Sequence, residues 1–243
     1  MVRTTRLYTP QVLQCSETLT LETKQSHHLL KVLRAKIGQQ LVLFNGDGYN
    51  YAATLADSAG KNAQLTIGNK TDAANESPLH ITLLQGLSRG DRMDTAIQKS
   101  TELGVNTIVP VLCERSNYSI NTDRINKKLE HWKQIIISAC EQSGRALIPQ
   151  LSDIQSFDDA TELFADHDKI LLSTDAAKRL KDILKPENKL CIFIGPEGGL
   201  SPEEVTSAIN KNFKNIQFGP RILRTETAGP AVISAAQILW GDF

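Results

Sequence analysis

One stretch near the C-terminus decides how the second half of this chain folds: Ile192-Phe193-Ile194-Gly195-Pro196-Glu197-Gly198-Gly199-Leu200-Ser201-Pro202-Glu203-Glu204. It contains, in order, an apolar strand, a glycine-rich turn and the start of a helix. In open α/β sheets, ligands bind beyond the carboxyl ends of the strands, and glycines there let a ligand approach the backbone closely. The stretch therefore predicts a ligand site in the turn that follows the strand.

The helix that follows the turn indicates what kind of ligand to expect. Ser201 as N-cap, Pro202 in the first turn and Glu204 three residues on form a capping box. Helix N-termini attract anions, but Glu197, Glu203 and Glu204 add negative charge here, and the glycine spacing matches neither a P-loop nor a dinucleotide motif. A neutral or cationic ligand such as S-adenosylmethionine is favoured over a phosphate. The alternative is a sharp turn with an ordinary capping box and no ligand.

The chain around this stretch alternates between strands and helices. From Leu79 onward, apolar strands recur between helices, and the longest helix is expected at about residues 123–143, where apolar residues return every three or four positions. This is the pattern of a mostly parallel sheet with helices on both faces. The expected strands span residues 79–84, 107–112, 169–172, 190–194 and 215–218.

The first seventy residues follow a different pattern, dominated by short strands. Asn45-Gly46-Asp47-Gly48 between two apolar runs is a strong hairpin signal, and one short helix is expected between Ser26 and Lys36. Several short strands in so few residues favour a small barrel. A polar stretch that ends at Pro78 marks a boundary, so we predict two domains, residues 1–72 and 73–243.

The composition is that of an ordinary globular protein, with 40% hydrophobic residues, 22% charged residues and no net charge. No stretch approaches the roughly 18 apolar residues of a membrane helix, and the N-terminus lacks the apolar core of a signal peptide. The four cysteines are scattered, so we expect reduced thiols, a cytoplasmic protein and no metal site. Residues 1–72 hold eight basic and five acidic side chains, and this mildly basic domain could meet a polyanion.

Two motifs, Gly195–Ser201 and Arg221–Ala228, closely resemble the knotted C-terminal motifs of the SPOUT methyltransferases. Within that class the chain is similar to the RsmE family, the 16S ribosomal RNA (uracil-N3) methyltransferases. The likeness covers essentially the whole chain and includes four further motifs in order. These are His27-His28-Leu29-Leu30-Lys31-Val32-Leu33-Arg34, Gly90-Asp91-Arg92-Met93-Asp94, Gln98-Lys99-Ser100-Thr101-Glu102-Leu103-Gly104 and Glu141-Gln142-Ser143-Gly144-Arg145.

The resemblance implies a SPOUT α/β trefoil-knot methyltransferase domain preceded by a small PUA-like β-barrel domain that binds RNA. It also implies S-adenosylmethionine as cofactor, bent within the knot and held mainly by backbone groups. The expected homodimer would pack the last helix against its mate around Val232, Ile233, Ala236 and Trp240, whereas a monomer would bury this stripe in its own core. The cofactor contacts carried over by motif are Leu172, Ser173, Ile194, Gly195, Pro196, Glu197, Gly198, Phe218, Gly219, Ile222, Leu223, Arg224, Glu226, Thr227 and Ala228.

The implied reaction needs groups that act on uracil and on RNA. Arg224 could stabilise negative charge that develops on the uracil carbonyls, and the alternative is a pairing with Glu226 or Glu197. The other candidates for the acceptor pocket are Glu102, Glu141 and Arg145, and no residue stands out as a general base. Contacts to the phosphates of 16S rRNA in the small ribosomal subunit are expected from Arg3, Arg6, Lys31, Arg34, Lys36, Arg89, Arg92 and Arg115.

Three other functions stay open on the sequence alone. The chain could be a SPOUT methyltransferase that acts on another RNA or on a ribose oxygen. It could also be a non-catalytic RNA-binding module on a knotted scaffold, in which case it would not bind S-adenosylmethionine with useful affinity. An enzyme that uses a phosphate nucleotide is the third option, and ATP binding would reveal it.

Overall fold

The computed structural model describes residues 4–58, 62–117 and 122–243, and the chain divides into two compact units. The first unit comprises residues 1–76 and 140–148, and the second comprises residues 77–139 and 149–243. The division at 76/77 lies four residues beyond the predicted boundary. The sequence did not predict that residues 140–148, here called the return segment, pack with the first unit.

The first unit is built on a five-stranded sheet with the strand order β1-β3-β4-β5-β2. Its pairs are antiparallel except β1 with β3, and the predicted hairpin joins β3 to β4. Leucines at 43, 55 and 65 are fully buried and form its core. The elements are β1 (Thr5–Tyr8), β2 (Thr18–Thr20), α1 (Thr23–His27), a π-helical turn (His28–Val32), β3 (Gln40–Phe44), β4 (Tyr49–Asp57) and β5 (Gln64–Asp72).

Polar contacts hold the return segment against the rest of the first unit. Glu141 Oε1 accepts a hydrogen bond from the Tyr8 backbone N–H at 3.0 Å, and Arg6 Nη2 donates to the Arg145 carbonyl oxygen at 3.1 Å. Arg145 is 3% exposed and forms a bidentate pair with Glu76, with Nε–Oε1 at 2.9 Å and Nη2–Oε2 at 2.6 Å. These contacts give both Glu141 and Arg145 structural partners within the first unit.

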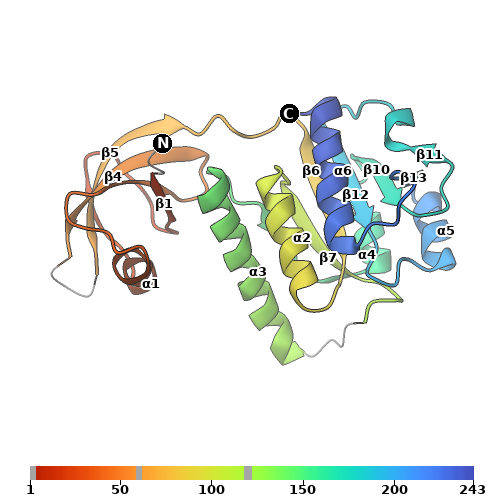
Figure 1. Ribbon diagram of the computed structural model, residues 1–243, viewed down its shortest axis with the longest axis horizontal. Helices are drawn as coiled ribbons and strands as arrows, with labels where there is room; N and C mark the ends of the chain where they lie inside the picture. The colour runs from red at the N-terminus through yellow and green to blue at the C-terminus, as the bar shows by residue number, and fades with distance from the viewer. Residues whose placement is uncertain (1–3, 59–61, 118–121) are drawn as a thin grey trace. The chain divides into compact units, whose positions relative to one another are not determined.

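The second unit contains an all-parallel sheet with the strand order β11-β13-β10-β12-β6-β7-β8, and β9 also pairs with β7. Helices α2 and α6 lie side by side (Figure 1). The strands are β6 (His80–Gly86), β7 (Thr107–Leu112), β8 (Gln150–Leu151), β9 (Gln155–Ser156), β10 (Asp168–Leu172), β11 (Lys178–Arg179), β12 (Lys189–Ile194) and β13 (Lys214–Gln217). The helices are α2 (Asp91–Glu102), α3 (Thr122–Ser143), α4 (Phe157–Glu162), a 3₁₀ turn (Leu180–Asp182), α5 (Pro202–Asn210) and α6 (Thr225–Trp240).

Strand β12 occupies the middle of this sheet, between β10 and β6. Its residues Cys191, Ile192 and Phe193 are fully buried, as expected for a central strand of a parallel sheet that is covered on both faces. Because neighbouring parallel strands end at the same edge, the loops after β10, β12 and β13 all leave the sheet at one edge. This strand order therefore gathers segments that are far apart in the sequence.

Helix α6 buries three of the four residues that were expected to form a dimer interface, and the fourth, Trp240, is half-buried. Val232, Ile233 and Ala236 are all fully buried, and the helix packs on α2, β6 and β12 of its own unit. That expectation is wrong for these three residues, because they already belong to the core of the unit. The apolar side chains that α6 and the last residues leave exposed are Ile238, Leu239 and Phe243.

The described residues contain neither a membrane helix nor a metal cluster. No helix within residues 4–58, 62–117 and 122–243 is long and apolar enough to span a bilayer. In the same ranges, no group of three or more His, Cys, Asp and Glu side chains is arranged to hold a metal ion.

Candidate active site

A cavity of about 1110 Å³ lies at the carboxyl ends of β10, β12 and β13. Its walls come from the loops after these three strands and from the first turn of α6. All the cofactor contacts expected from the sequence line this cavity except Thr227. The structure therefore brings together residues that are spread over more than fifty positions of the chain. Their contact with a cofactor stays a prediction.

The glycine turn has the capping box predicted from the sequence. The Glu204 backbone N–H donates to Ser201 Oγ at 3.2 Å, and the Ser201 backbone N–H donates to Glu204 Oε2 at 2.9 Å. Glu204 also accepts from the Glu114 backbone N–H at 2.8 Å, so its carboxylate faces the protein interior. Of the three carboxylates that the sequence places at this helix start, only Glu197 lines the cavity.

Close backbone contact joins the glycine turn to the end of β6. A Cβ atom on Gly86 would lie only 2.5 Å from the Pro196 nitrogen and 2.8 Å from the Gly195 carbonyl carbon. No side chain fits such a gap, and therefore only glycine lets the two strand ends approach this closely. Gly86 was not predicted to belong to the site, because the predicted strand ended at Leu84; in the structure it is the last residue of β6, and a glycine within a strand is a recognised sign of close backbone approach.

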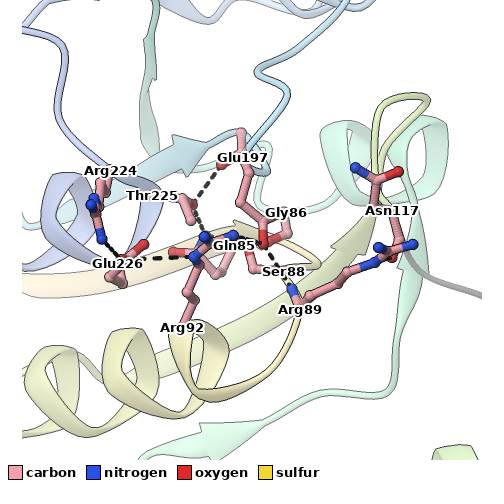
Figure 2. Close-up of polar contacts among 11 residues, drawn as sticks. Gln85, Gly86, Ser88, Arg89, Arg92, Asn117, Glu197, Arg224, Thr225 and Glu226 are labelled. Atoms are coloured by element: carbon pink, nitrogen blue, oxygen red, sulfur yellow. Dashed lines mark hydrogen bonds and ion pairs between the residues drawn. The ribbon is translucent and has the colours of Figure 1, made fainter.

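A chain of hydrogen bonds fixes the start of α6 to the same turn. Gln85 Nε2 donates to Thr225 Oγ1 at 2.9 Å, and Thr225 Oγ1 donates to the Gly195 carbonyl oxygen at 2.7 Å (Figure 2). Both side chains are buried. Thr225 lies within the predicted motif Arg221–Ala228, whereas Gln85 was not predicted to belong to the site, because an uncharged Gln in a strand carries no chemical signal of its own.

We predict that Gly86→Ala lowers the stability of the protein by about 1–3 kcal/mol, because the added methyl group must push backbone atoms apart. The loss of the close approach should also weaken S-adenosylmethionine binding. Gly229→Ala is the matched control, because its Cβ would make ordinary contacts of 3.5 Å with Gln85 Oε1 and 3.8 Å with Ile194 Cγ1. Since alanine suits a helix interior, this variant should gain up to about 1 kcal/mol. Urea unfolding and calorimetric titration measure both effects, and equal stability of the two variants would contradict the prediction.

Glu197 is held by two hydrogen-bond donors, of which one, Arg92, also lines the cavity. Its Oε1 accepts hydrogen bonds from the Arg89 backbone N–H at 2.9 Å and from Arg92 Nη1 at 2.8 Å. Burial opposes its ionisation most strongly, but these two hydrogen bonds and the Arg92 charge together hold the pKa of Glu197 below its ordinary value. Glu197 is therefore a carboxylate that both lines the cavity and orients Arg92.

Glu226, in the first turn of α6, is held less tightly. Its Oε1 lies 4.0 Å from both Arg92 Nε and Arg224 Nη1, which is beyond hydrogen-bond distance. Its Oε2 is buried and has no hydrogen-bond partner in the part of the chain that the structure describes. Figure 2 shows the Glu226 side chain between the two arginines.

The remaining residues expected near the acceptor base lie in different places. Arg115 lines the cavity, and its Nη1 is 3.4 Å from the Gly198 carbonyl oxygen. The Arg89 side chain donates to the Asn117 carbonyl oxygen. Glu102 stands at the end of α2, where Lys99 Nζ donates to it at 2.9 Å, and it does not line the cavity. Glu141 and Arg145 belong to the first unit, as described above.

The basic residues expected to bind phosphate in the first unit divide into two groups. Lys31, Arg34 and Lys36 are exposed at and after the π-helical turn. Arg6 is half-buried, donates to Asn50 Oδ1 at 2.8 Å and lies over the Phe44 ring at 5.0 Å. Its guanidinium is thus already engaged within the unit. Arg3 lies outside the described residues.

The cavity fits a bent sulfonium cofactor. Apolar side chains of Leu172, Ile194 and Leu223 face it together with backbone groups of the glycine turn, which suits an adenine ring and a ribose. The Glu197 carboxylate adds negative charge to the same lining. Arg92, Arg115 and Arg224 also line the cavity, so an anionic or carbonyl-bearing second ligand can approach the same space.

The parallel sheet with a cavity at the ends of its central strands, the separate β-domain, and the matches below together place the chain among the α/β RNA methyltransferases of the SPOUT class that carry a PUA-like domain. The family described as RNA methyltransferase domain matches residues 75–237, and the family described as RNA methyltransferase PUA domain matches residues 21–68. Both matches agree with the fold class that the sequence predicted. The chain belongs to the ribosomal RNA small subunit methyltransferase E family.

Sequence relatives of that name cover nearly the whole chain. The relative from Buchnera aphidicola subsp. Schizaphis graminum is 36% identical, and the match spans 99% of this chain and 98% of the relative. The relative from Bacillus subtilis is 30% identical, and the match spans 96% of each chain.

Two solved structures are similar over their full length. A methyltransferase of Legionella pneumophila in complex with S-adenosylmethionine superimposes with a TM-score of 0.96 at 38% identity and covers 100% of both chains. The ribosomal RNA small subunit methyltransferase E of Neisseria gonorrhoeae, bound to S-adenosylmethionine, gives a TM-score of 0.94 at 40% identity and covers 99% of this chain and 100% of that one.

Proposed function

We propose that this protein transfers a methyl group from S-adenosylmethionine to N3 of a specific uridine in the 16S rRNA of the small ribosomal subunit. The observation that carries the proposal is the cavity in which the separated cofactor motifs meet beside Arg92, Glu226 and Arg224. The name shared by the relatives of this chain supports a ribosomal RNA substrate. Two proteins of similar structure hold S-adenosylmethionine.

The residues that would hold the cofactor are those that line the cavity around the glycine turn. The backbone of Gly195, Gly198 and Gly219 can donate to and accept from its polar groups, and Leu172 and Leu223 can enclose its ring. When bound, the cofactor supplies an electrophilic methyl group. The fixed walls hold the reactants in one orientation, and orientation alone can supply a large part of the acceleration.

The acceptor base must leave any duplex before it can react. Uracil N3 is hidden by base pairing, so the enzyme must act on a single-stranded or flipped nucleotide. Arg224 would then stabilise negative charge on a uracil carbonyl, and Arg92 and Arg115 would contact the RNA near the reacting base. Catalytic roles for Glu102, Glu141 and Arg145 stay predictions, to be weighed against their contacts with Lys99, Tyr8 and Glu76.

The experiment that tests the proposal maps methylated nucleotides in ribosomal RNA. Small subunits and naked 16S rRNA, both from cells that lack the protein, are incubated with it and S-adenosylmethionine, and the product is located by primer extension and mass spectrometry. A single N3-methyluridine supports the proposal. Methylation of a ribose oxygen, or of an RNA other than 16S rRNA, would favour a SPOUT methyltransferase with a different substrate. If the protein did not bind S-adenosylmethionine, a non-catalytic RNA-binding module would be favoured.

Arg34→Ala is expected to weaken RNA binding. It should also reduce the slope of log affinity against log salt concentration by about one unit, the change expected when one phosphate contact is lost. Arg34 is exposed and adopts a φ of 54°, and alanine keeps the Cβ, so the backbone strain is the same in both proteins. Filter binding over a range of salt concentrations measures the slope. Lys127→Ala serves as the control, because it removes one positive charge at an exposed position of α3 in the second unit. An unchanged slope for Arg34→Ala would show that this residue does not touch phosphate.

Two further properties belong to the proposal. We expect a homodimer in the cytoplasm, with the exposed Ile238, Leu239 and Phe243 at the end of α6 as the apolar surface available for it. Sedimentation equilibrium of the protein and of an Ile238→Glu variant measures this, since a charge in a dimer interface should release monomers.

A further inference from the structure

We propose that Arg92, Glu226 and Arg224 together recognise the imide edge of the target uracil, and that Glu226 Oε2 accepts the proton from N3. The inference rests on the proposed function, because it concerns the same reaction. It supplies the general base that the sequence alone did not reveal.

The first argument is the unused hydrogen-bonding capacity of Glu226. Its side chain is only 16% exposed, and its Oε2 is buried without a partner among the described residues. A buried carboxylate oxygen without a donor is unfavourable, so this atom is expected to meet a donor when a ligand fills the cavity. Glu197, which lines the same cavity, differs because two donors already bind its Oε1.

The second argument is the order of donors and acceptors. Arg92 and Arg224 stand on either side of the Glu226 carboxylate (Figure 2), and the nearest atoms, Arg92 Nε and Arg224 Nη1, each lie 4.0 Å from Oε1, the oxygen next to the proposed base Oε2. This row presents donor, acceptor and donor groups. The imide edge of uracil presents O4, N3–H and O2, which are acceptor, donor and acceptor, so the two rows are complementary.

The same row disfavours cytosine. At the corresponding edge, cytosine presents an amino donor, an unprotonated N3 acceptor and O2. The N3 lone pair would face the Glu226 carboxylate, and the amino group would face a guanidinium that can only donate. The row can therefore select the base as well as activate it.

The third argument is the fixed backbone position at which Glu226 begins. Glu226 follows Thr225, whose hydroxyl donates to the Gly195 carbonyl oxygen at 2.7 Å and accepts from Gln85 Nε2 at 2.9 Å. The carboxylate is thereby attached to the glycine turn that forms a wall of the cofactor cavity. A base held in this way needs little reorganisation during the reaction.

The proton transfer balances without any further reagent. The N3–H bond breaks, its electron pair stays on N3, and the proton moves to Glu226 Oε2. The pair on N3 then forms the bond to the methyl carbon, while the electrons of the carbon–sulfur bond stay on sulfur. Arg92 and Arg224 offset the negative charge that O2 and O4 gain in between, and Glu226 finally releases its proton to solvent.

Glu226→Gln tests the inference, because it keeps the shape of the side chain and removes its basicity. Single-turnover methylation of 16S rRNA at saturating S-adenosylmethionine should slow by about 10²–10⁴-fold, the range typical of a lost general base. Calorimetric titration measures the affinity for S-adenosylmethionine in parallel, and saturating cofactor keeps any change in that affinity out of the measured rate. Glu130→Gln, which makes the same change on the exposed face of α3, is the matched control.

Three readouts separate a base from a structural residue. The rate of Glu226→Gln should rise with pH in the alkaline range more steeply than that of the natural protein, since the uracil then loses its proton unaided. RNA that carries the more acidic 5-fluorouracil at the target position should raise the methylation rate of the variant by a larger factor than that of the natural protein. Without cofactor, the preference for RNA with uracil over cytosine at that position should fall by about 5- to 150-fold in the variant.

Three results would overturn the inference. Natural-like turnover of Glu226→Gln would remove Glu226 from the reaction. A loss of S-adenosylmethionine affinity with an unchanged saturated rate would assign the residue to the cofactor. If the rate of Glu226→Gln were lower by the same factor at every pH, and with uracil and 5-fluorouracil alike, the role of Glu226 would be structural. If the natural protein itself leaves 16S rRNA unmethylated, the proposed function fails instead, and the two failures are distinct.

Discussion

Arg224→Ala is expected to slow methyl transfer by about 10²–10³-fold, the usual effect of removing one donor that stabilises developing negative charge. The fold should not change, because the Arg224 side chain is 81% exposed and its ion pair with Glu226 spans 4.0 Å. For the same reason, affinity for S-adenosylmethionine should change little. The rate is measured under single turnover on 16S rRNA, and the affinity by calorimetric titration.

Two further variants define the role of Arg224. Arg224→Lys keeps the charge but loses the planar fork of donors, so it should recover only part of the rate. Arg179→Ala removes an exposed arginine of β11 that does not line the cavity and serves as the control. Turnover of Arg224→Ala close to that of the natural protein would show that Arg224 has no catalytic role and only pairs with Glu226.

Arg145→Ala is expected to destabilise the protein by about 3–5 kcal/mol, because it leaves the carboxylate of Glu76 without its partner in a largely buried site. Arg145 is 3% exposed and both of its contacts to Glu76 are 2.9 Å or shorter. The pair joins the return segment to Glu76, which ends the first stretch of the first unit, residues 1–76. Urea unfolding, followed by a spectroscopic signal of the first unit, measures the loss.

The double variant Glu76→Leu, Arg145→Met distinguishes a structural from a catalytic role of Arg145. A buried ion pair can often be replaced by apolar side chains of similar volume at little cost, so this protein should be nearly as stable as the natural one. If it also methylates 16S rRNA at a normal rate, Arg145 acts through the fold. A stable but inactive double variant would instead support the catalytic role predicted from the sequence.

Sequence patterns predicted the local elements well, because each depends on neighbouring residues. The hairpin at Asn45-Gly46-Asp47-Gly48 is confirmed, and its positive φ angles fall on Gly46 and Gly48, where glycine adopts them at low cost. The capping box at Ser201 and Glu204 is confirmed for the same local reason. The motif resemblance also identified the fold class. Of the cofactor contacts that it named, all except Thr227 line one cavity.

Other features arise from contacts between residues that are far apart in the sequence. The stripe at Val232, Ile233 and Ala236 was consistent with either a dimer interface or a core, and only the packing of α6 on α2, β6 and β12 decided for the core. The return segment begins within α3, whose residues up to 139 belong to the second unit, so no local pattern showed that Arg145 would pair with Glu76.

The sequence by itself determined the strand, the glycine turn and the capped helix at residues 192–204, because these follow from backbone preferences and local hydrogen bonds. It also determined the family, because several motifs occur in order along the whole chain. Only the tertiary structure decided that β12 lies between β10 and β6, that Gly86 contacts Pro196, and that Glu226 lies between Arg92 and Arg224. The physical reason is that a site is made by chain segments packed side by side, and the sheet order that packs them is set by the burial of the whole core rather than by any one segment.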